Sequence, residues 1–254
     1  MDRIYSTCIA ALVAALVIGC GGGQKPTTDT AQTAQAPPPP PIDPTTVATI
    51  SGRITLQGTP PKAERIQTKS DPNCKQPVFT QSYVVGKDGA LQNVFVYVKD
   101  GLGKYTIPVP TEPVVLAQKN CTYEPHVLGI MAGQPLELRN DDPTLHNIHA
   151  VPTANREFNM GQPIQGMRQT HVFSATEVLV PFKCDVHHWM SAFVGVLDHP
   201  FYAVTNTDGT FEIKGLPPGT YTIEAVHEKL GRQTQTITVG AKESKTDLSF
   251  TFKV

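Results

Sequence analysis

The chain has 254 residues, of which 21 are basic and 22 are acidic, so its formal net charge is −1. That balance excludes a strongly basic nucleic-acid binder, and a charged fraction of 17% does not suit a chain that is disordered throughout. Glycine and proline number 20 and 23, which indicates many turns and favours a β-rich protein. The five cysteines are an odd number, so each needs a separate assignment.

The N-terminus has the pattern of an export signal. Residues 9–18 read IAALVAALVI, which is long enough for the core of a signal peptide but shorter than the roughly 20 residues that span a bilayer. The run ends in VIGC, which resembles a bacterial lipobox with Cys20 as its lipidated cysteine. We predict a lipoprotein signal peptide over residues 1–19 and a lipid anchor on the periplasmic side of a bacterial membrane. The alternative is a plain secretory signal with an incidental cysteine.

The next segment, residues 20–45, has the composition of a tether. It reads CGGGQKPTTDTAQTAQAPPPPPIDPT, without apolar periodicity and with five consecutive prolines at 37–41. Such a segment buries too little apolar surface to offset the entropy of ordering it. We expect a disordered tether, flexible at first and stiffer in its polyproline part, that keeps the folded region away from the membrane.

The remainder predicts an all-β protein. Sustained helical periodicity is missing, and short β-branched or alternating runs recur at Ile50–Leu56, Val94–Val98, Leu136–Arg139, Val178–Phe182, Phe193–Leu197, Phe211–Lys214, Thr220–Val226 and Gln235–Val239. Turn signals such as KDG, NDDP, TDG and LPPG separate these runs. About 210 residues allow two compact β-domains.

One loop has the composition of a metal site. The sequence VLVPFKCDVHHWM predicts a strand that leads into Cys184, followed by His187 and Met190 in a C-x2-H-x2-M spacing. Upstream, His146 follows a predicted turn. One thiolate, two imidazoles and a weak thioether are the donors of a mononuclear blue-copper site.

The stretch from about Glu112 to Asp198 resembles a cupredoxin, and its ligand loop has the amicyanin spacing. The resemblance implies a Greek-key β-sandwich that holds one copper ion. It implies that His146, Cys184 and His187 are the equatorial ligands and that Met190 is the axial ligand. It also implies that an asparagine after the first histidine ties the two ligand loops together, and Asn147 has that place. In the family the ring edge of the second histidine is exposed, so His187 would be the electron port, with Trp189 beside it. The loop departs from the family at Asp185-Val186, where Ser/Thr-Pro is usual.

Other metal sites fit less well. Structural zinc prefers cysteine and histidine at all four positions, and methionine is a poor zinc ligand. A binuclear copper centre would need a second cysteine at the position of His188, and multicopper enzymes need H-x-H pairs that are missing from this sequence. His188 and His149 remain alternative ligands. The histidines at 126, 171, 199 and 227 are expected to be structural.

The remaining cysteines can then be assigned. Cys8 lies in the predicted signal peptide, which leaves Cys74 and Cys121 for a disulfide in an exported protein. The alternative is a second cysteine-based copper or redox site, although neither cysteine has a similar C-x2-H neighbourhood.

The C-terminus resembles the carboxypeptidase-regulatory-like family, a transthyretin-like β-sandwich. The shared marks are T-x-x-D-G-x-F, G-L-P-P-G and Y-T-I-E-A. The family's first strands, G-x-I-x-L-x-G and V-x-V, occur far upstream, before the cupredoxin-like part. We therefore predict a split sandwich, residues 46–105 and 199–254, with a cupredoxin domain at 106–198 inserted into it. An independent N-terminal β-domain is the alternative.

The leading functional hypothesis is a membrane-tethered copper protein that transfers single electrons and is not an enzyme. Its partner would be another redox protein, such as a c-type cytochrome or a dehydrogenase, that docks weakly near His187, and the chain would be a monomer. A copper carrier would use the same ligands. A third hypothesis is a structural or carbohydrate-binding β-module without a redox role.

Overall fold

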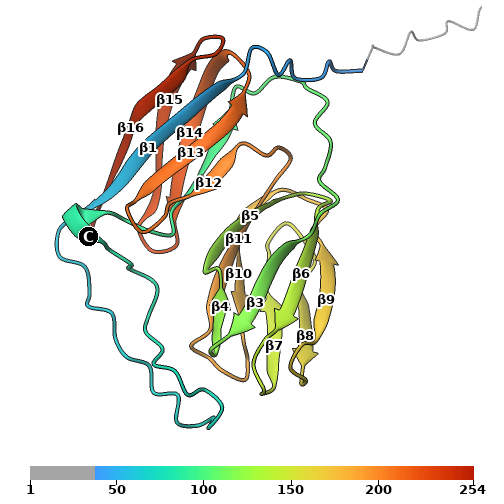
Figure 1. Ribbon diagram of the computed structural model, residues 1–254, viewed down its shortest axis with the longest axis vertical. Helices are drawn as coiled ribbons and strands as arrows, with labels where there is room; N and C mark the ends of the chain where they lie inside the picture. Colours follow the sequence, from blue (N-terminus) through green and yellow to red (C-terminus); the bar gives the residue numbers. More distant parts are fainter. Residues whose placement is uncertain (1–37) are drawn as a thin grey trace, which may run out of the picture. The chain divides into compact units, whose positions relative to one another are not determined.

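The computed structural model describes residues 38–254, which consist almost entirely of strands and loops, with one short 3₁₀ turn at Lys87–Gly89 (Figure 1). The prediction of an all-β protein is therefore confirmed. The predicted signal peptide, Cys20 and the first part of the tether lie outside the described residues. A search of residues 38–254 finds no helix that is long and apolar enough to cross a membrane.

Seven strands from the two ends of the described chain form one sandwich, which we call the terminal sandwich. One sheet has the order β13-β1-β16 and the other has the order β12-β2-β14-β15. The strands are β1 (Ala48–Gln57), β2 (Phe95–Asp100), β12 (Tyr202–Val204), β13 (Thr210–Leu216), β14 (Gly219–His227), β15 (Gly231–Val239) and β16 (Ser244–Lys253). Because side chains alternate along a strand, Ile50 and Ile54 of β1 enter a core shared with Val96 and Ile223.

The first strand belongs with the last part of the chain. Strand β1 pairs antiparallel with β13 and parallel with β16, and its Ile54 lies opposite Phe250. On the other sheet, β2 lies between β12 and β14. Segments more than 100 residues apart therefore share one core, and the terminal sandwich cannot form from either segment alone.

Nine strands between β2 and β12 form a second sandwich, which we call the inserted sandwich. Its sheets have the orders β5-β11-β10-β7-β8 and β4-β3-β6-β9. The strands are β3 (Val114–Lys119), β4 (Thr122–Glu124), β5 (Val127–Met131), β6 (Pro135–Asn140), β7 (His146–Ala150), β8 (Phe158–Gln162), β9 (Arg168–Val172), β10 (Glu177–Lys183) and β11 (Ser191–Leu197). Strands β2 and β12 are hydrogen-bonded neighbours, with Tyr97 opposite Tyr202, so the chain leaves and re-enters the terminal sandwich at adjacent strands.

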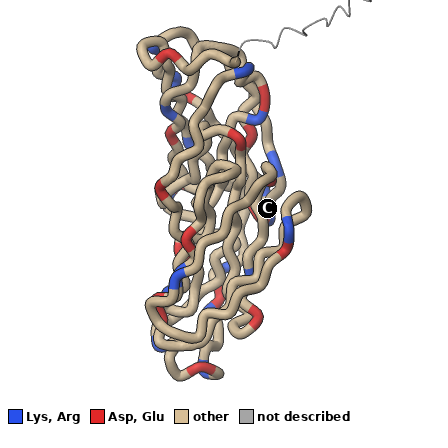
Figure 2. The backbone as a smooth tube through the Cα atoms, turned by 90° about the vertical axis from the view of Figure 1, so that its right-hand side faces the viewer, with Lys and Arg blue, Asp and Glu red and all other residues tan. Residues whose placement is uncertain are grey.

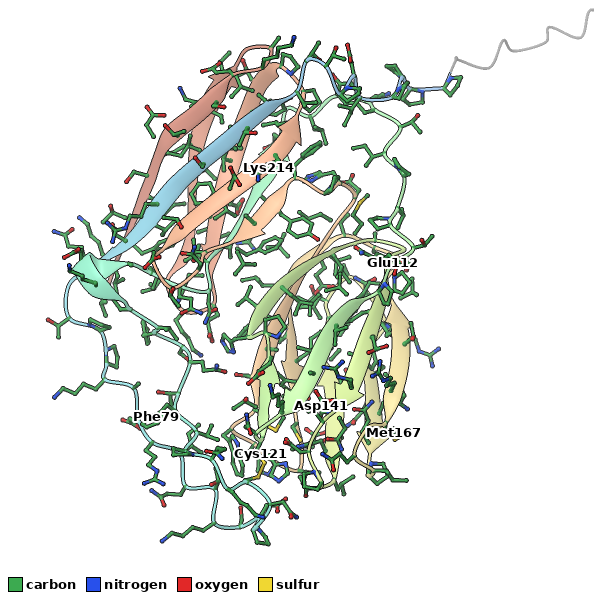
Figure 3. The ribbon with its side chains drawn as sticks, in the orientation of Figure 1. Phe79, Glu112, Cys121, Asp141, Met167 and Lys214 are labelled. Carbon is green, nitrogen blue, oxygen red and sulfur yellow. A yellow bond between two sulfur atoms is a disulfide. The ribbon has the colours of Figure 1, made fainter. Side chains whose placement is uncertain are left out.

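A long loop connects β1 to β2. We call residues 58–86 of this loop the arm. Backbone hydrogen bonds join its two sides, from Ile66 N to Val78 O and from Thr80 N to Glu64 O. The arm leaves the terminal sandwich and its tip reaches the inserted sandwich near Cys121, which is labelled in Figure 3. The strand pattern of the sequence did not predict this excursion.

The end of the predicted tether is bound to the folded region. Thr106 donates hydrogen bonds to the carbonyl groups of Pro39 and Pro40, and Pro41 forms a β-bridge with the same residue. Residues 39–41 thus lie beside Thr106 in the linker between the sandwiches. We expected this part to be disordered; the carbonyl groups of a polyproline segment are free acceptors, and Thr106 uses them.

Candidate metal centre

The candidate ligands lie at the ends of neighbouring strands in the five-stranded sheet. His146 begins β7, Cys184 directly follows β10, and Met190 directly precedes β11. Strand β10 pairs with both β7 and β11, so these strand ends meet at one edge of the inserted sandwich. The short loop from Cys184 to Met190 carries His187 back over the same point, because Met190 N donates to His187 O at 2.9 Å.

Three donor atoms converge in a buried space. Ligand atoms of His146, Cys184 and His187 all lie within 4.8 Å of one another. The two Nδ1 atoms of the histidines are 2.8 Å apart, and Cys184 Sγ is 4.0 Å from His187 Nδ1. The exposed fractions of the three residues are 0%, 1% and 2%. Buried nitrogen and sulfur atoms that lie this close together can bind a metal cation.

Each imidazole has a carboxylate on its outer nitrogen. His146 Nε2 is 2.9 Å from Asp142 Oδ2, and His187 Nε2 is 3.1 Å from Asp71 Oδ2. Because an ionised carboxylate only accepts hydrogen bonds, both Nε2 atoms are the donors. With each Nε2 engaged in this way, the Nδ1 atoms of both rings face each other and the sulfur, and a metal ion there would be bound through the two Nδ1 atoms, as metal-binding histidines are. The donor set therefore fits a thiophilic transition metal.

The thiol of Cys184 is poised to ionise. Burial acts to raise its pKa, but hydrogen bonds from His146 and His187 and from backbone groups outweigh burial and lower the pKa to about 6. The backbone N–H of His187 donates to the sulfur at 3.3 Å. At neutral pH the thiolate, which is the form that binds metals, is thus favoured without a metal.

Asn147 connects the two ligand-bearing segments. Its Oδ1 accepts hydrogen bonds from Asp185 N at 2.6 Å and Val186 N at 3.3 Å, and it lies 3.3 Å from Cys184 Sγ. Its Nδ2 donates to Asn159 Oδ1 at 2.6 Å. The residue next to His146 therefore fixes the backbone on which Cys184 lies.

Met190 and Trp189 close the inner side of the loop. Met190 is 1% exposed and packs in the core cluster of the inserted sandwich together with Cys184, whose N–H donates to Met190 O at 3.3 Å. Trp189 Nε1 donates to the carbonyl oxygen of Cys121 at 2.9 Å, and its ring centroid lies 5.0 Å from that of His187. Both side chains are thus fixed around the donor cluster.

The predicted exposure of His187 is wrong. Its side chain is buried because the tip of the arm covers the ring edge: Asp71 bonds Nε2, and Cys74 Sγ lies 3.8 Å from the same nitrogen. A disulfide joins Cys74 to Cys121. The residues next to His187 in the sequence do not indicate that the arm covers its ring, since the arm is more than 100 residues away in the sequence.

The alternative ligands lie elsewhere. His188 is exposed, and His149 bonds Glu157 at 2.7 Å and Asp185 at 2.8 Å. The four histidines that we expected to be structural are in other contacts: His126 with Glu228, His171 against Phe158, His199 with Val98 O and His227 with backbone N–H groups.

Sequence reasoning missed the two carboxylates. Asp142 precedes His146 by four residues in the sequence NDDPTLH, and its place in a turn was recognised while its bond to the histidine was not. Asp71 lies three residues before Cys74, so the predicted disulfide to Cys121 was the signal that this part of the arm approaches the inserted sandwich.

Comparison with solved structures gives several similar proteins. The chain is similar to a copper-containing nitrite reductase (NirK) from Thermus scotoductus SA-01, with 19% identity and a TM-score of 0.31, over 37% of this chain and 24% of the reductase. It thus spans about a quarter of that protein. It is also similar to a purple cupredoxin from Nitrosopumilus maritimus (27% identity, TM-score 0.28, 33% of this chain and 97% of that one). A third is a mutant of amicyanin in its Cu(I) form (20% identity, TM-score 0.30, 35% of this chain and 85% of that one).

Comparison with sequences gives one family. No curated protein sequence matches this chain. The family match begins in β11, the last strand of the inserted sandwich, and continues through β12 to β16 of the terminal sandwich. Residues 192–253 match the carboxypeptidase regulatory-like domain.

Proposed function

We propose that this chain is a mononuclear copper protein that transfers single electrons. The observation that supports the proposal is the convergence of His146 Nδ1, His187 Nδ1 and Cys184 Sγ at one buried point, with both outer nitrogens engaged by carboxylates. Copper bound there would supply one-electron chemistry by alternating between Cu(I) and Cu(II). Met190, in the same loop, would be the weak axial ligand.

The surrounding residues would keep the donors in place in both oxidation states. His146 and Cys184 lie at the ends of paired strands, and Asn147 bonds both segments. The ligands are buried, so solvent has little room to rearrange when the charge changes. A fixed, dry donor set favours fast electron transfer over release of the metal.

Exposed apolar side chains beside the ligands would provide the docking surface. Leu145, which precedes His146, is 46% exposed, and Val186, which precedes His187, is 44% exposed. Basic and acidic residues are interspersed along the described backbone, and no extended run of one sign stands out in Figure 2. A partner such as a c-type cytochrome or a dehydrogenase would dock weakly on this apolar surface, while a lipid at Cys20 would keep the protein on the periplasmic side of a membrane.

A redox titration of the copper-loaded protein tests this function against a copper carrier. We expect a reversible one-electron potential, with copper retained through repeated reduction and oxidation in the presence of a competing chelator. Val186→Asp is expected to slow electron exchange with small redox proteins and leave copper retention unchanged. Rapid loss of Cu(I) to the chelator at each reduction would contradict electron transfer and favour delivery of copper.

A further inference from the structure

The arm places the carboxylate of Asp71 next to His187, a ligand of the proposed copper site. Asp71 is held at the tip by its own turn: its Oδ1 accepts the N–H of Asn73 at 2.7 Å, and its backbone carbonyl accepts the N–H of Cys74 at 3.1 Å. Its Oδ2 is the acceptor for both His187 Nε2 and the hydroxyl group of Thr144. Every contact of this carboxylate therefore supports one orientation, toward His187.

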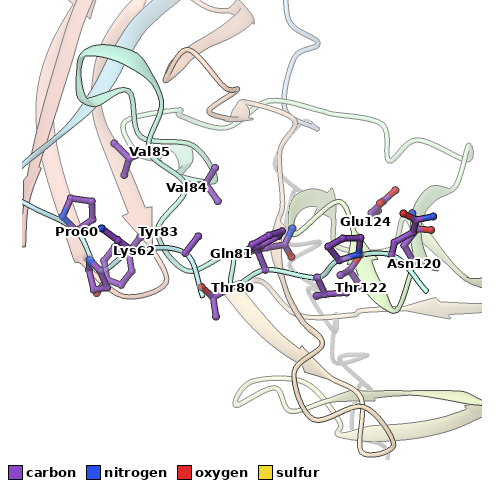
Figure 4. A pocket seen from close by; sticks show the side chains of 16 residues that line it. Pro60, Lys62, Thr80, Gln81, Tyr83, Val84, Val85, Asn120, Thr122 and Glu124 are labelled. Carbon is purple, nitrogen blue, oxygen red and sulfur yellow. The ribbon is translucent and has the colours of Figure 1, made fainter. Parts of the chain in front are cut away.

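The tip of the arm is attached to the inserted sandwich. The Cys74–Cys121 disulfide provides a covalent link there, and Cys74 Sγ packs 3.8 Å from His187 Nε2. The arm and the inserted sandwich also line a groove of about 850 Å³, with Pro60, Lys62 and Tyr83 among the arm residues and Asn120, Thr122 and Glu124 on the opposite side (Figure 4). At the tip, Asp71 and Cys74 thus both contact the outer nitrogen of His187.

We propose that Asp71 is a positioning residue for the copper site, which fixes the outer nitrogen of His187 and, together with the disulfide, closes the ring edge of this ligand to solvent. The inference rests on the proposed function, because His187 must be a copper ligand. It adds that electrons do not pass through an exposed His187 ring edge, and that a residue from the terminal sandwich's long loop sets the properties of a metal centre in the inserted sandwich.

The negative charge of Asp71 is the physical reason why it should influence the copper site. A carboxylate that accepts the outer N–H of a metal-bound imidazole makes the imidazole a stronger donor, and loss of such a partner costs about 10–100-fold in metal affinity. Strong donation stabilises Cu(II), which carries the higher charge, more than Cu(I). If the Cu(II) affinity falls tenfold more than the Cu(I) affinity, the reduction potential rises by about 59 mV, the value of one decade for a one-electron couple.

The test is the reduction potential of the copper-loaded, full-length Asp71→Asn protein. Asparagine keeps the size and an acceptor oxygen, so the variant removes mainly the charge. We expect a rise of about 59 mV relative to wild type, one decade of relative affinity for a one-electron couple. Glu64→Gln is the matched control, since it removes the same charge from an exposed position on the same arm, and its potential is expected to stay at the wild-type value. Asp71→Glu, which restores the carboxylate, is expected to lie closer to wild type than Asp71→Asn.

A second measurement needs no variant and no metal. Long-range ¹H–¹⁵N NMR of the metal-free wild-type protein is expected to show His187 with its proton on Nε2, protected from exchange. A proton on Nδ1 with a bare Nε2, or a shift for Asp71→Asn no larger than that for Glu64→Gln, would overturn the role of Asp71 while the copper protein stands. Failure of the wild-type protein to bind copper would overturn both.

Discussion

Asn147 shows how one side chain can determine the shape of the loop that carries Cys184 and His187. Its Oδ1 receives the N–H groups of Asp185 and Val186, which point inward at the turn after Cys184. A buried N–H group that loses its acceptor costs about 1–3 kcal/mol, which is more than the net value of most hydrogen bonds. The loop should therefore depend on this amide even when no metal is bound.

Asn147→Ala is expected to destabilise the metal-free protein by about 1–3 kcal/mol, because two backbone donors lose their acceptor. Denaturant unfolding measures the change. Asn159→Ala is the matched control: it removes the side-chain bonds to Asp185 Oδ2 at 2.7 Å and from Asn147 Nδ2 at 2.6 Å, while both backbone N–H groups keep Asn147 Oδ1 as their acceptor. An equal effect of both substitutions would contradict the role of Asn147.

Spacing in the sequence was sufficient for the nearest residues of the site. Cys184, His187 and Met190 lie in one loop, so their spacing along the chain is enough to bring them together. The pairing of β10 with β7 then brings His146 beside them. It was insufficient for Asp71 and for the burial of His187, because these depend on a contact between segments 116 residues apart.

At the scale of elements, the arm is the part whose conformation depends most on a single link. Backbone hydrogen bonds join its two sides, and the disulfide fastens its tip to the loop between β3 and β4. Much of the arm is exposed. Its position over His187 should therefore depend on Cys74 and Cys121.

The double variant Cys74→Ser/Cys121→Ser is expected to lose up to about 4 kcal/mol of unfolding free energy, the chain-entropy value for two cysteines 47 residues apart. Limited proteolysis should cut this variant within the arm at protease concentrations that leave the wild type intact. Intact arms in both proteins under these conditions would show that the disulfide is not what fastens the arm.

The β14–β15 hairpin contains a histidine, His227, that makes the folded chain less stable at acid pH. Burial lowers the pKa of His227 to about 4, and its Nδ1 accepts the N–H groups of Lys229 and Leu230, which protonation would disrupt. The unfolded chain binds this proton near pH 6.5, so between about pH 6.5 and pH 4 it holds more protons than the folded chain. Stability therefore falls as the pH falls through this window.

Between about pH 7 and pH 4, His227 is expected to account for a loss of roughly 3 kcal/mol of unfolding free energy in the metal-free protein. Denaturant unfolding at several pH values measures this loss. The His227→Gln variant should lose about that much less over the same range, whereas replacing the exposed His188 with glutamine should leave the wild-type slope. A slope that His227→Gln does not change would refute this assignment.

The strands were predictable where their two faces differ. The apolar alternation of residues 50–56 and 220–226 predicted β1 and β14, which have one face in a core. The edge strands β8 and β9 were not predicted, because half-buried and polar residues such as Asn159 and Gln169 dominate them and give a weak pattern.

At the scale of the whole described chain, a third apolar cluster joins the two sandwiches. It consists of Phe95, Tyr97, Val127, Leu197 and Val226. Glycines allow the close approach: a Cβ atom at Gly195 would lie 2.3 Å from the ring of Phe95, and one at Gly129 would lie 2.3 Å from the ring of Tyr202. The hydroxyl group of Tyr202 also donates to Gly129 O at 2.9 Å, which adds a polar contact.

Gly195→Ala is expected to lower the unfolding free energy by about 1–3 kcal/mol, because the added methyl group overpacks this cluster. The measurement is thermal or denaturant unfolding. Gly161→Ala is the control, since a Cβ atom there would meet nothing within 4 Å. Equal stability of the two variants would contradict close packing between the sandwiches.

The most direct test of the central claim is the absorption spectrum of the metal-free, full-length protein during titration with Cu(II). A copper ion bound by the thiolate of Cys184 and the imidazoles of His146 and His187 predicts an intense visible charge-transfer band that saturates at one copper per chain and is missing in Cys184→Ser. A protein that stays colourless, or a band that persists in Cys184→Ser, would contradict the copper site.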